Sequence, residues 1–340
     1  MGLDFKIVRN KEMLKALEIS EETRGKSLLL IKSAVELESQ WRDAKRQLDE
    51  INAEICKHND KIKNIVKSKG KIRQEEKSVS QELGLKQKRA KSQEEGSCEE
   101  FFNVWEQIGN FLDMSYYEGS DKREDFPECA KIMSTGFIIG DKILRKQEMI
   151  SWTCRLFAEQ GWDILQVPGF FQAKYARKVY TQSSFAQVQG KKAKLLIKSP
   201  LQALYLQNYK SIIVLPYRTL GFGVCFSNSL IQKEKFSLLH LITPSDYKSS
   251  LNSLIILCQN YLNSLNISTK TYTKPPRQLK PALSFQLTFL TTTFPPIKIL
   301  SIKSSTDYLT RKCLTKSLQG HFFPYAISAS FCSFDILSEL

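Results

Sequence analysis

Apolar residues between positions 30 and 62 recur at alternating spacings of four and three residues, the pattern of a coiled-coil helix. The seam consists of Leu30, Ala34, Leu37, Trp41, Ala44, Leu48, Ile51, Ile55, His58 and Ile62. A second, patchier periodic run extends from about position 74 to Leu112. Gly70 lies between the two runs and marks the turn. Because so narrow a seam needs a covering helix, the sequence predicts an antiparallel helical hairpin.

The second half of the chain has a different period. Residues 284–291 and 297–302 alternate between apolar and polar side chains, which predicts strands of one antiparallel sheet. Residues 269–281 contain threonines, prolines and bases without apolar periodicity, and this favours an exposed loop. The predicted fold class is therefore α+β, with a hairpin arm over residues 1–112 and a body over residues 113–340.

Charge is distributed very unevenly between the two halves. The formal net charge is +15, but residues 1–163 carry −1 and residues 164–340 carry +16. The seventy residues between Asp163 and Glu234 include no carboxylate. Such an excess favours a polyanionic partner. It also limits chemistry in the body, because carboxylates are the usual general bases and magnesium ligands.

Basic residues concentrate around the predicted turn of the hairpin. One interpretation is an ordinary solvated helix surface, which charged runs usually indicate. The other is an arm that binds the phosphates of a nucleic acid without reading its bases. The candidate nucleic-acid-binding residues are Lys57, Lys61, Lys63, Lys67, Lys69, Lys71 and Arg73.

Several other classes of protein are disfavoured. The eight cysteines lie at least 19 residues apart, so CxxC metal or redox spacing is absent and no metal site is predicted. No run of 18 uncharged apolar residues is present, and the first residues lack an apolar leader region. These features predict a soluble, cytoplasmic protein that does not associate with a membrane.

Short segments occur along the chain in a characteristic order. The hairpin pattern exits through Ile108-Gly109-Asn110, and a helix and strand over 146–168 end in a proline. Further segments lie at 136–144, 195–205, 215–218, 221–226 and 305–311. This collinear series resembles the eukaryotic cytosolic seryl-tRNA synthetases, which belong to the class II aminoacyl-tRNA synthetases. The resemblance implies a tRNA-binding arm, a mostly antiparallel class II body and a dimer formed through 146–168, in a chain shorter than typical members.

The chain departs from that family where its chemistry resides. The family's serine-binding Thr-x-Glu corresponds to Lys198-Ser199-Pro200, and the Phe-Arg-x-Glu of motif 2 corresponds to Phe226-Ser227-Asn228-Ser229. Two further family carboxylates fall at Ser237 and Lys298, and residues 312–340 contain no arginine to bind the γ-phosphate. The matching but substituted positions are Lys198, Pro200, Ser227, Ser229, Ser237 and Lys298. No catalytic residue is therefore assigned.

Three functional hypotheses follow. The first is a synthetase-like protein that binds tRNA, serine tRNA by the resemblance, but has lost ATP-dependent serine activation. It would pair with itself or with a related synthetase. The second is a divergent but working serine–tRNA ligase, which alone would require ATP and Mg²⁺. The third is a structural coiled-coil protein. No cofactor is expected under the first or the third.

Overall fold

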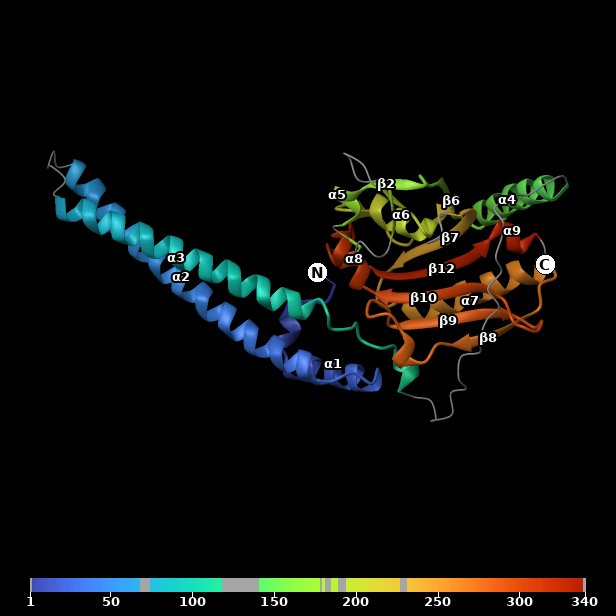
Figure 1. Cartoon of the computed structure of the whole chain (residues 1–340), viewed down its shortest axis with the longest axis horizontal. Coiled ribbons are helices and arrows are strands. Elements are labelled where there is room, and N and C mark those ends of the chain that lie inside the picture. Colours follow the sequence, from blue (N-terminus) through green and yellow to red (C-terminus); the bar gives the residue numbers. More distant parts are fainter. Residues whose placement is uncertain are drawn as a thin grey trace. The chain divides into compact units, whose positions relative to one another are not determined.

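The computed structural model of the chain describes residues 2–67, 74–117, 141–177, 179–180, 185–188, 194–226 and 231–338. The chain divides into two compact units (Figure 1). One unit is Asp4–Ile108, and the other consists of Met1–Leu3 with Gly109–Leu340. No helix in the described ranges is both long and apolar enough to cross a membrane.

The first unit is a helical hairpin preceded by short helices. A 3-10 helix, Phe5–Arg9, leads into α1 (Lys11–Thr23), whose first turn is capped by the Asn10 side chain. The long helices α2 (Leu29–Lys67) and α3 (Gln74–Trp105) then lie side by side in opposite directions (Figure 1). Every residue of the predicted seam is buried or half-buried, which confirms the register.

The second helix of the hairpin is shorter than its periodicity predicts. Ile108 and Leu112 continue the helical spacing, but α3 ends at Trp105. In the body, the backbone N–H of Asn110 donates to the Pro281 carbonyl at 2.7 Å. The Asn110 side chain donates to the Ser305 carbonyl at 2.9 Å. These two bonds to residues far along the chain hold Asn110 outside a helix, and α3 ends at Trp105, so the prediction of a helix to position 112 was wrong.

Aromatic side chains pack around Trp41, near the start of α2 and beside the end of α3. The Trp41 ring stacks on Phe101, with centroids 5.7 Å apart and planes at 16°, and meets Phe5 edge-on at the same separation. Its Nε1–H donates to Glu94 Oε1 at 2.8 Å, joining α2 to α3. The indole is half-buried rather than fully buried. Trp41 therefore contributes both apolar area and one polar contact between the helices.

We expect Trp41→Ala to lower the free energy of unfolding by roughly 2–3 kcal/mol, somewhat less than for a fully buried tryptophan. Trp41→Phe retains the ring and loses the hydrogen bond, so its cost should be about 1 kcal/mol. Urea unfolding measures both. Leu29→Ala, at a side chain that is 70% exposed on the same helix, is the control. A loss for Trp41→Ala no larger than that of the control would contradict this packing.

The body is built on a seven-stranded sheet in the order β1-β6-β7-β12-β10-β9-β8 (Figure 1). The only parallel pair among these strands joins β1 (Asp163–Gln166) to β6 (Tyr217–Phe226). The antiparallel strands are β7 (Gln232–Ile242), β12 (Tyr325–Ser333), β10 (Lys298–Thr306), β9 (Phe285–Thr291) and β8 (Thr269–Thr273). The predicted strands at 284–291 and 297–302 are confirmed, and the sheet is mostly antiparallel as the fold class required.

The remaining elements surround this sheet. They are α4 (Asp141–Glu159), β2 (Phe170–Gln172), α5 (Ala173–Ala176), β3 (Ala186–Val188), β4 (Lys194–Leu196), α6 (Pro200–Gln207), β5 (Ile212–Ile213), α7 (Tyr247–Ser264), α8 (Tyr308–Cys313), β11 (Lys316–Ser317), α9 (Phe334–Leu337) and two 3-10 turns, Met114–Tyr116 and Pro276–Gln278. The helix and strand expected at 146–168 are α4 and β1, whereas the segment 136–140 lies outside the described residues.

The two faces of the sheet have different neighbours. One face packs against α4 and α7 through the main core, in which Phe157, Phe236 and Tyr261 meet. On the opposite face, α6 covers β6 and β7, and Gly221 permits the close approach. A Cβ placed at Gly221 would lie 2.9 Å from the Leu204 side chain. The face beyond α6, over β12, β10 and β9, carries polar side chains.

The segment predicted as an exposed loop at 269–281 begins with strand β8, so that prediction was wrong for residues 269–273. β8 pairs antiparallel with β9 at the edge of the sheet. An edge strand needs few apolar residues, and the β-branched Thr269, Thr271 and Thr273 suit a pleated surface. The absence of apolar periodicity concealed the strand.

Candidate functional site

Hydroxyl groups form a row across four strands on the polar face of the body sheet. Strand register places Ser237 opposite Ser330, Ser330 opposite Ser301, and Ser301 opposite Thr288. Directly opposed residues point to the same face, so these side chains lie together. Ser237, Ser301 and Thr288 are at most 1% exposed.

Four lysines surround this row and line a cavity of about 320 Å³. Lys233 and Lys235 come from β7, and Lys298 and Lys303 come from β10, on the other side of β12. Ser199, Ser301, Ser330 and Ser333 contribute hydroxyls to the same cavity. No carboxylate of the described residues lines it.

Burial and mutual repulsion change the ionisation of this cluster. The pKa of Lys303 falls to about 7, first because the side chain is desolvated and then because Lys298 and other lysines lie nearby. Burial also raises the pKa of the neighbouring Cys332 thiol to about 12, so that the thiol stays neutral at physiological pH. Among the described residues that line it, the cavity thus has four basic side chains and no acidic one.

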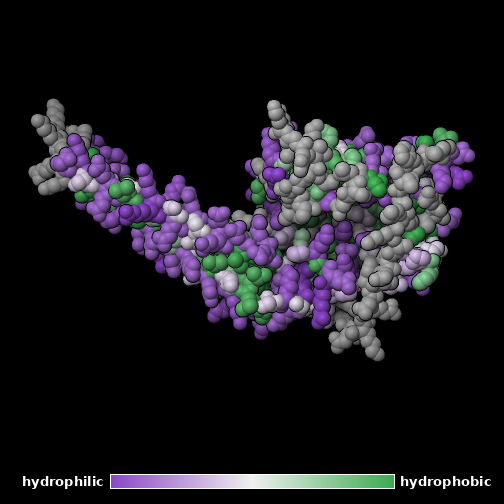
Figure 2. All heavy atoms as spheres, in the orientation of Figure 1, coloured by the Kyte–Doolittle hydropathy of each residue, from purple (hydrophilic) through white to green (hydrophobic). Residues whose placement is uncertain are grey.

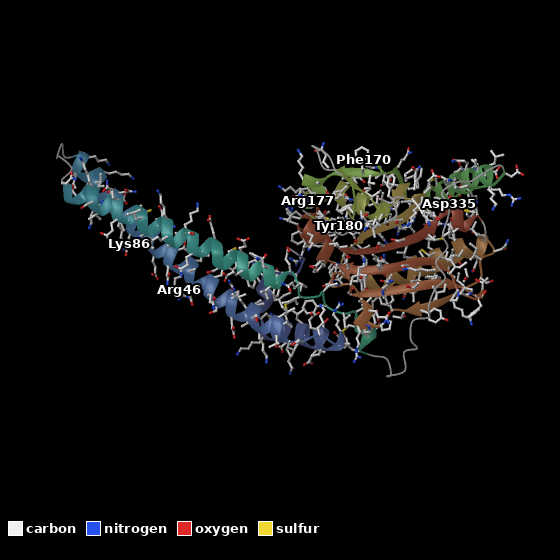
Figure 3. The ribbon with its side chains drawn as sticks, in the orientation of Figure 1. Arg46, Lys86, Phe170, Arg177, Tyr180 and Asp335 are labelled. Carbon is white, nitrogen blue, oxygen red and sulfur yellow. The ribbon has the colours of Figure 1, made fainter. Side chains whose placement is uncertain are left out.

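The acids closest in sequence to the cavity are paired elsewhere. Strand alternation directs Glu234 away from Lys233 and Lys235, and its Oε2 lies 2.6 Å from Lys146 Nζ. Asp335, labelled in Figure 3 on α9, meets the same ammonium at 3.4 Å. Burial opposes the charge of Lys146, but its hydrogen bond to Glu234 and the attraction of both acids raise its pKa overall.

The positions that the family resemblance singled out fall partly into this site. Lys298 is exposed at the cavity, and Ser237 lies in the hydroxyl row, with its Oγ 3.3 Å from Ser199 Oγ. Pro200 is buried as the first residue of α6, whose N-terminus has a capping box formed by Ser199 and Gln202. Lys198 precedes this cap and does not line the cavity. Ser227 and Ser229 lie outside the described residues.

Sequence analysis missed Lys233, Lys303, Ser301, Ser330 and Ser333 as site residues. A signal existed, because serine and lysine alternate with apolar residues at period two along β10 and β12. That alternation indicates a polar sheet face. It does not reveal that β12 lies between β7 and β10. This strand order brings the lysines of β7 and the lysines of β10 to the same cavity.

The basic end of the hairpin is the second candidate site. Lys57, Lys61, Lys63 and Lys67 are all exposed on the last turns of α2. Residues four apart share one side of a helix, so Lys57 and Lys61 lie on one flank of the seam and Lys63 and Lys67 on the other. Lys63 forms an exposed ion pair with Asp60 at 3.3 Å. Lys69, Lys71 and Arg73 lie outside the described residues.

Hydrophilic residues cover most of the hairpin surface (Figure 2). Further along it, the labelled side chains of Arg46 and Lys86 project outward (Figure 3). Lys86 is already paired with Glu82 at 2.8 Å, and Arg46 lies 3.5 Å from Asp43. At the seam near the basic end, His58 Nε2 lies 2.9 Å from Ser80 Oγ, which links the two helices by a polar contact. In the described ranges, no three side chains of the metal-binding types come together.

A long helical hairpin followed by a mostly antiparallel sheet with flanking helices defines a fold of the class II aminoacyl-tRNA synthetase type. No protein-family model and no curated protein matches the sequence. Solved structures show that the fold is that of the seryl-tRNA synthetases. A cytoplasmic serine-tRNA ligase from Naegleria fowleri, in complex with AMP, superposes with a TM-score of 0.80 at 16% identity, covering 99% of this chain and 92% of that one.

Two further solved structures agree on the class of fold. Seryl-tRNA synthetase from Pyrococcus horikoshii, complexed with ATP, gives a TM-score of 0.81 at 11% identity, covering 98% of this chain and 92% of that one. Prolyl-tRNA synthetase from Giardia lamblia, with prolyl-adenylate, gives 0.51 at 11% identity, covering 58% of this chain and 45% of that one. Of these three structures, the two serine enzymes align with nearly the whole chain, and so with both of its units, whereas the prolyl enzyme aligns with 58% of it.

Proposed function

We propose that the chain is a seryl-tRNA synthetase-like protein that binds tRNA through its hairpin arm, residues 1–112, and has lost ATP-dependent activation of serine. The body, residues 113–340, retains the class II architecture without the groups that the chemistry needs. The cytoplasm is the compartment where such a protein meets tRNA, and the Naegleria fowleri relative in structure is described as cytoplasmic.

The observation that carries tRNA binding is the exposed lysine pairs at the end of the hairpin. Lys57 with Lys61, and Lys63 with Lys67, offer positive charge on both flanks of the seam. Lysines of this kind attract phosphates regardless of base sequence, and each contact releases condensed counterions. A solvated helix surface would carry the same residue types, so the salt dependence of binding is what separates the two interpretations.

The loss of serine activation is supported by the chemistry of the body site. In the family, Arg and Mg²⁺ neutralise the ATP phosphates and carboxylates bind serine and the metal. Here Lys298 replaces one such carboxylate and Ser237 another, by the resemblance. The two acids considered as substitutes for them are already paired: Glu234 with Lys146 at 2.6 Å, and Asp307 with Arg311 at 2.6 Å. A displaced carboxylate would therefore first have to break an ion pair.

Binding of purified tRNA by the intact chain, measured over a series of salt concentrations, tests the proposal. We expect the logarithm of the association constant to fall linearly with the logarithm of salt, by roughly 0.7–0.9 for each phosphate contact. Equal binding of tRNA and of a neutral RNA analogue, or a flat salt response, would reject it and favour a structural coiled-coil protein.

We also propose a dimer, with a second copy or with a related synthetase, through the region of α4 and β1. On α4, Leu144 is 63% exposed and Ile143 42%, and Met149 and Trp152 line a surface cavity nearby. We expect sedimentation velocity at micromolar concentration to show a dimer, and Leu144→Glu to shift it towards a monomer. Pro296→Glu, on a loop of the body, is the control substitution. A monomer at every concentration, with no related subunit recovered, would contradict this.

A further inference from the structure

A cleft lies on the face of the body sheet that packs against α7, on the opposite side of the sheet from the lysine cavity. Arg218 of β6 and His240 of β7 are directly opposed in the strand register. Side chains alternate between the faces along β7, so His240 shares the face of Leu238, which belongs to the main core. Ser237, in the hydroxyl row, is on the other face. The cleft is therefore separate from the candidate site described above.

Two cavities meet in this cleft, and they share four lining residues: Arg218, His240, Ser250 and Ser253. The larger cavity, of about 320 Å³, is also lined by Asp246 at the start of α7. The smaller cavity, of about 190 Å³, is also lined by Trp162, Leu254 and Leu257. The cleft therefore has an acid at one end, an arginine in its shared middle and an apolar wall at the other end.

The arginine of the cleft is oriented by a histidine. Arg218 Nε–H donates to His240 Nε2 at 3.4 Å. Burial, and then the charge of Arg218, lower the pKa of His240 to about 4, so the ring is neutral and can accept this bond at physiological pH. Arg218 forms no ion pair with an acid of the described residues. Its two terminal amino groups match the two oxygens of a carboxylate.

The first turns of α7 offer groups that accept hydrogen bonds. Asp246 Oδ2 accepts from the Thr243 hydroxyl at 2.6 Å, which leaves Oδ1 for a ligand. The Ser249 and Ser253 hydroxyls donate to the Asp246 and Ser249 carbonyls, each at 2.9 Å. Because their protons are used in these bonds, the hydroxyls offer lone pairs to the cavity that they line. An ammonium group, which only donates, is the complement of such a surface.

We propose that this cleft binds a free α-amino acid with a large apolar side chain. Arg218 binds the carboxylate of the ligand, Asp246 and the hydroxyls of α7 bind its ammonium group, and the apolar wall covers its side chain. A zwitterion joins a cation and an anion that line one cavity without pairing with each other. The cavity volumes lie near or below the lower end of the range for drug-sized ligands, which favours a single amino acid. This binding is independent of tRNA binding by the arm.

Titration calorimetry of the full chain with L-phenylalanine and L-leucine tests the proposal. We expect saturable binding with a dissociation constant below about 1 mM. Phenylpropanoate lacks the ammonium group and phenethylamine lacks the carboxylate, so each should bind at least about tenfold more weakly than phenylalanine. Glycine and serine should also bind at least about tenfold more weakly, because neither has an apolar side chain to bury.

Four variants locate the bound amino acid. Arg218→Gln should weaken phenylalanine binding by about tenfold or more, because the carboxylate loses its charged partner. Asp246→Asn retains an oxygen for Thr243 and should weaken binding by about fivefold or more. Ser253→Trp, at an exposed position that lines both cavities, should fill the cleft and abolish binding. Arg277→Gln removes an exposed arginine elsewhere on the body and is the matched control, which should bind normally.

Several outcomes would overturn the proposal. They are the absence of saturable binding of either amino acid at millimolar concentration, serine binding as tight as phenylalanine binding, and unchanged affinity in Ser253→Trp. An equal loss in Arg218→Gln and Arg277→Gln would show an effect of total charge and would overturn it too. Arg218, Asp246 and Ser253 are exposed, so their variants should unfold at the same urea concentration as the unaltered chain. A loss of binding then reports on the cleft and not on stability.

Discussion

Changing Lys57, Lys61, Lys63 and Lys67 to glutamate should weaken tRNA binding by about 30- to 1000-fold at low salt. This range assumes that each exposed lysine–phosphate ion pair contributes roughly 0.5–1 kcal/mol. The slope of log affinity against log salt should also flatten, by roughly 0.7–0.9 for every phosphate that is no longer neutralised. Filter binding or fluorescence anisotropy over a salt series measures both quantities. Circular dichroism should be unchanged, because all four side chains are exposed.

A matched control lies on the same unit. Lys11, Lys15, Lys32 and Lys45 are also exposed, and their replacement by glutamate makes the same change in net charge away from the end of the hairpin. We expect this variant to lose affinity much less and to keep the salt slope. If the two quadruple variants behaved alike, binding would depend on total charge. If neither quadruple variant changed the slope of log affinity against log salt, the arm would not contact the phosphates of tRNA and would have only a structural role.

Restoring one phosphate-binding arginine should not restore serine activation. By the family resemblance, Ser227 would correspond to the motif 2 arginine, and an arginine that acts on a transferring phosphoryl group is typically worth about 10³–10⁵ in rate. We nevertheless expect Ser227→Arg to remain at least about 10³-fold below an ordinary synthetase in serine-dependent pyrophosphate exchange. Under our proposal, the carboxylates that would hold serine and Mg²⁺ are still replaced, at Pro200, Ser237 and Lys298. Groups that act as a unit do not contribute separately.

The control for this experiment is Ser245→Arg, at an exposed serine of the body, which adds the same charge away from the cavity. Both variants should unfold at the same urea concentration as the unaltered chain. Exchange by Ser227→Arg within about tenfold of an ordinary synthetase would show that the remaining groups of the site are present in displaced positions. In that case the divergent-ligase hypothesis would replace ours.

Sequence periodicity predicted the hairpin well because its stability depends on a local, repeating seam. Each residue from Leu30 to Ile62 in that seam is covered in the structure. The end of α3 could not be predicted in the same way. Ile108 and Leu112 keep the helical spacing, but the hydrogen bonds that Asn110 makes to Pro281 and Ser305 are contacts with residues more than 170 positions away.

The candidate site was only partly predictable for a similar reason. The resemblance identified Ser237 and Lys298 as substituted positions, and both lie at or beside the cavity. It gave no indication of Lys303 or Ser301, because a lysine on a strand of alternating pattern is usually solvent-facing. Only the order β7-β12-β10 brings these residues together and leaves Lys303 partly buried among other cations.

Serine-dependent ATP–pyrophosphate exchange by the unaltered chain, on a preparation already shown to bind tRNA, tests the central claim most directly. The proposed function predicts salt-sensitive tRNA binding together with exchange no faster than in a reaction without serine. Exchange at a rate near that of ordinary synthetases, with or without tRNA binding, would contradict it and make the chain a working serine–tRNA ligase.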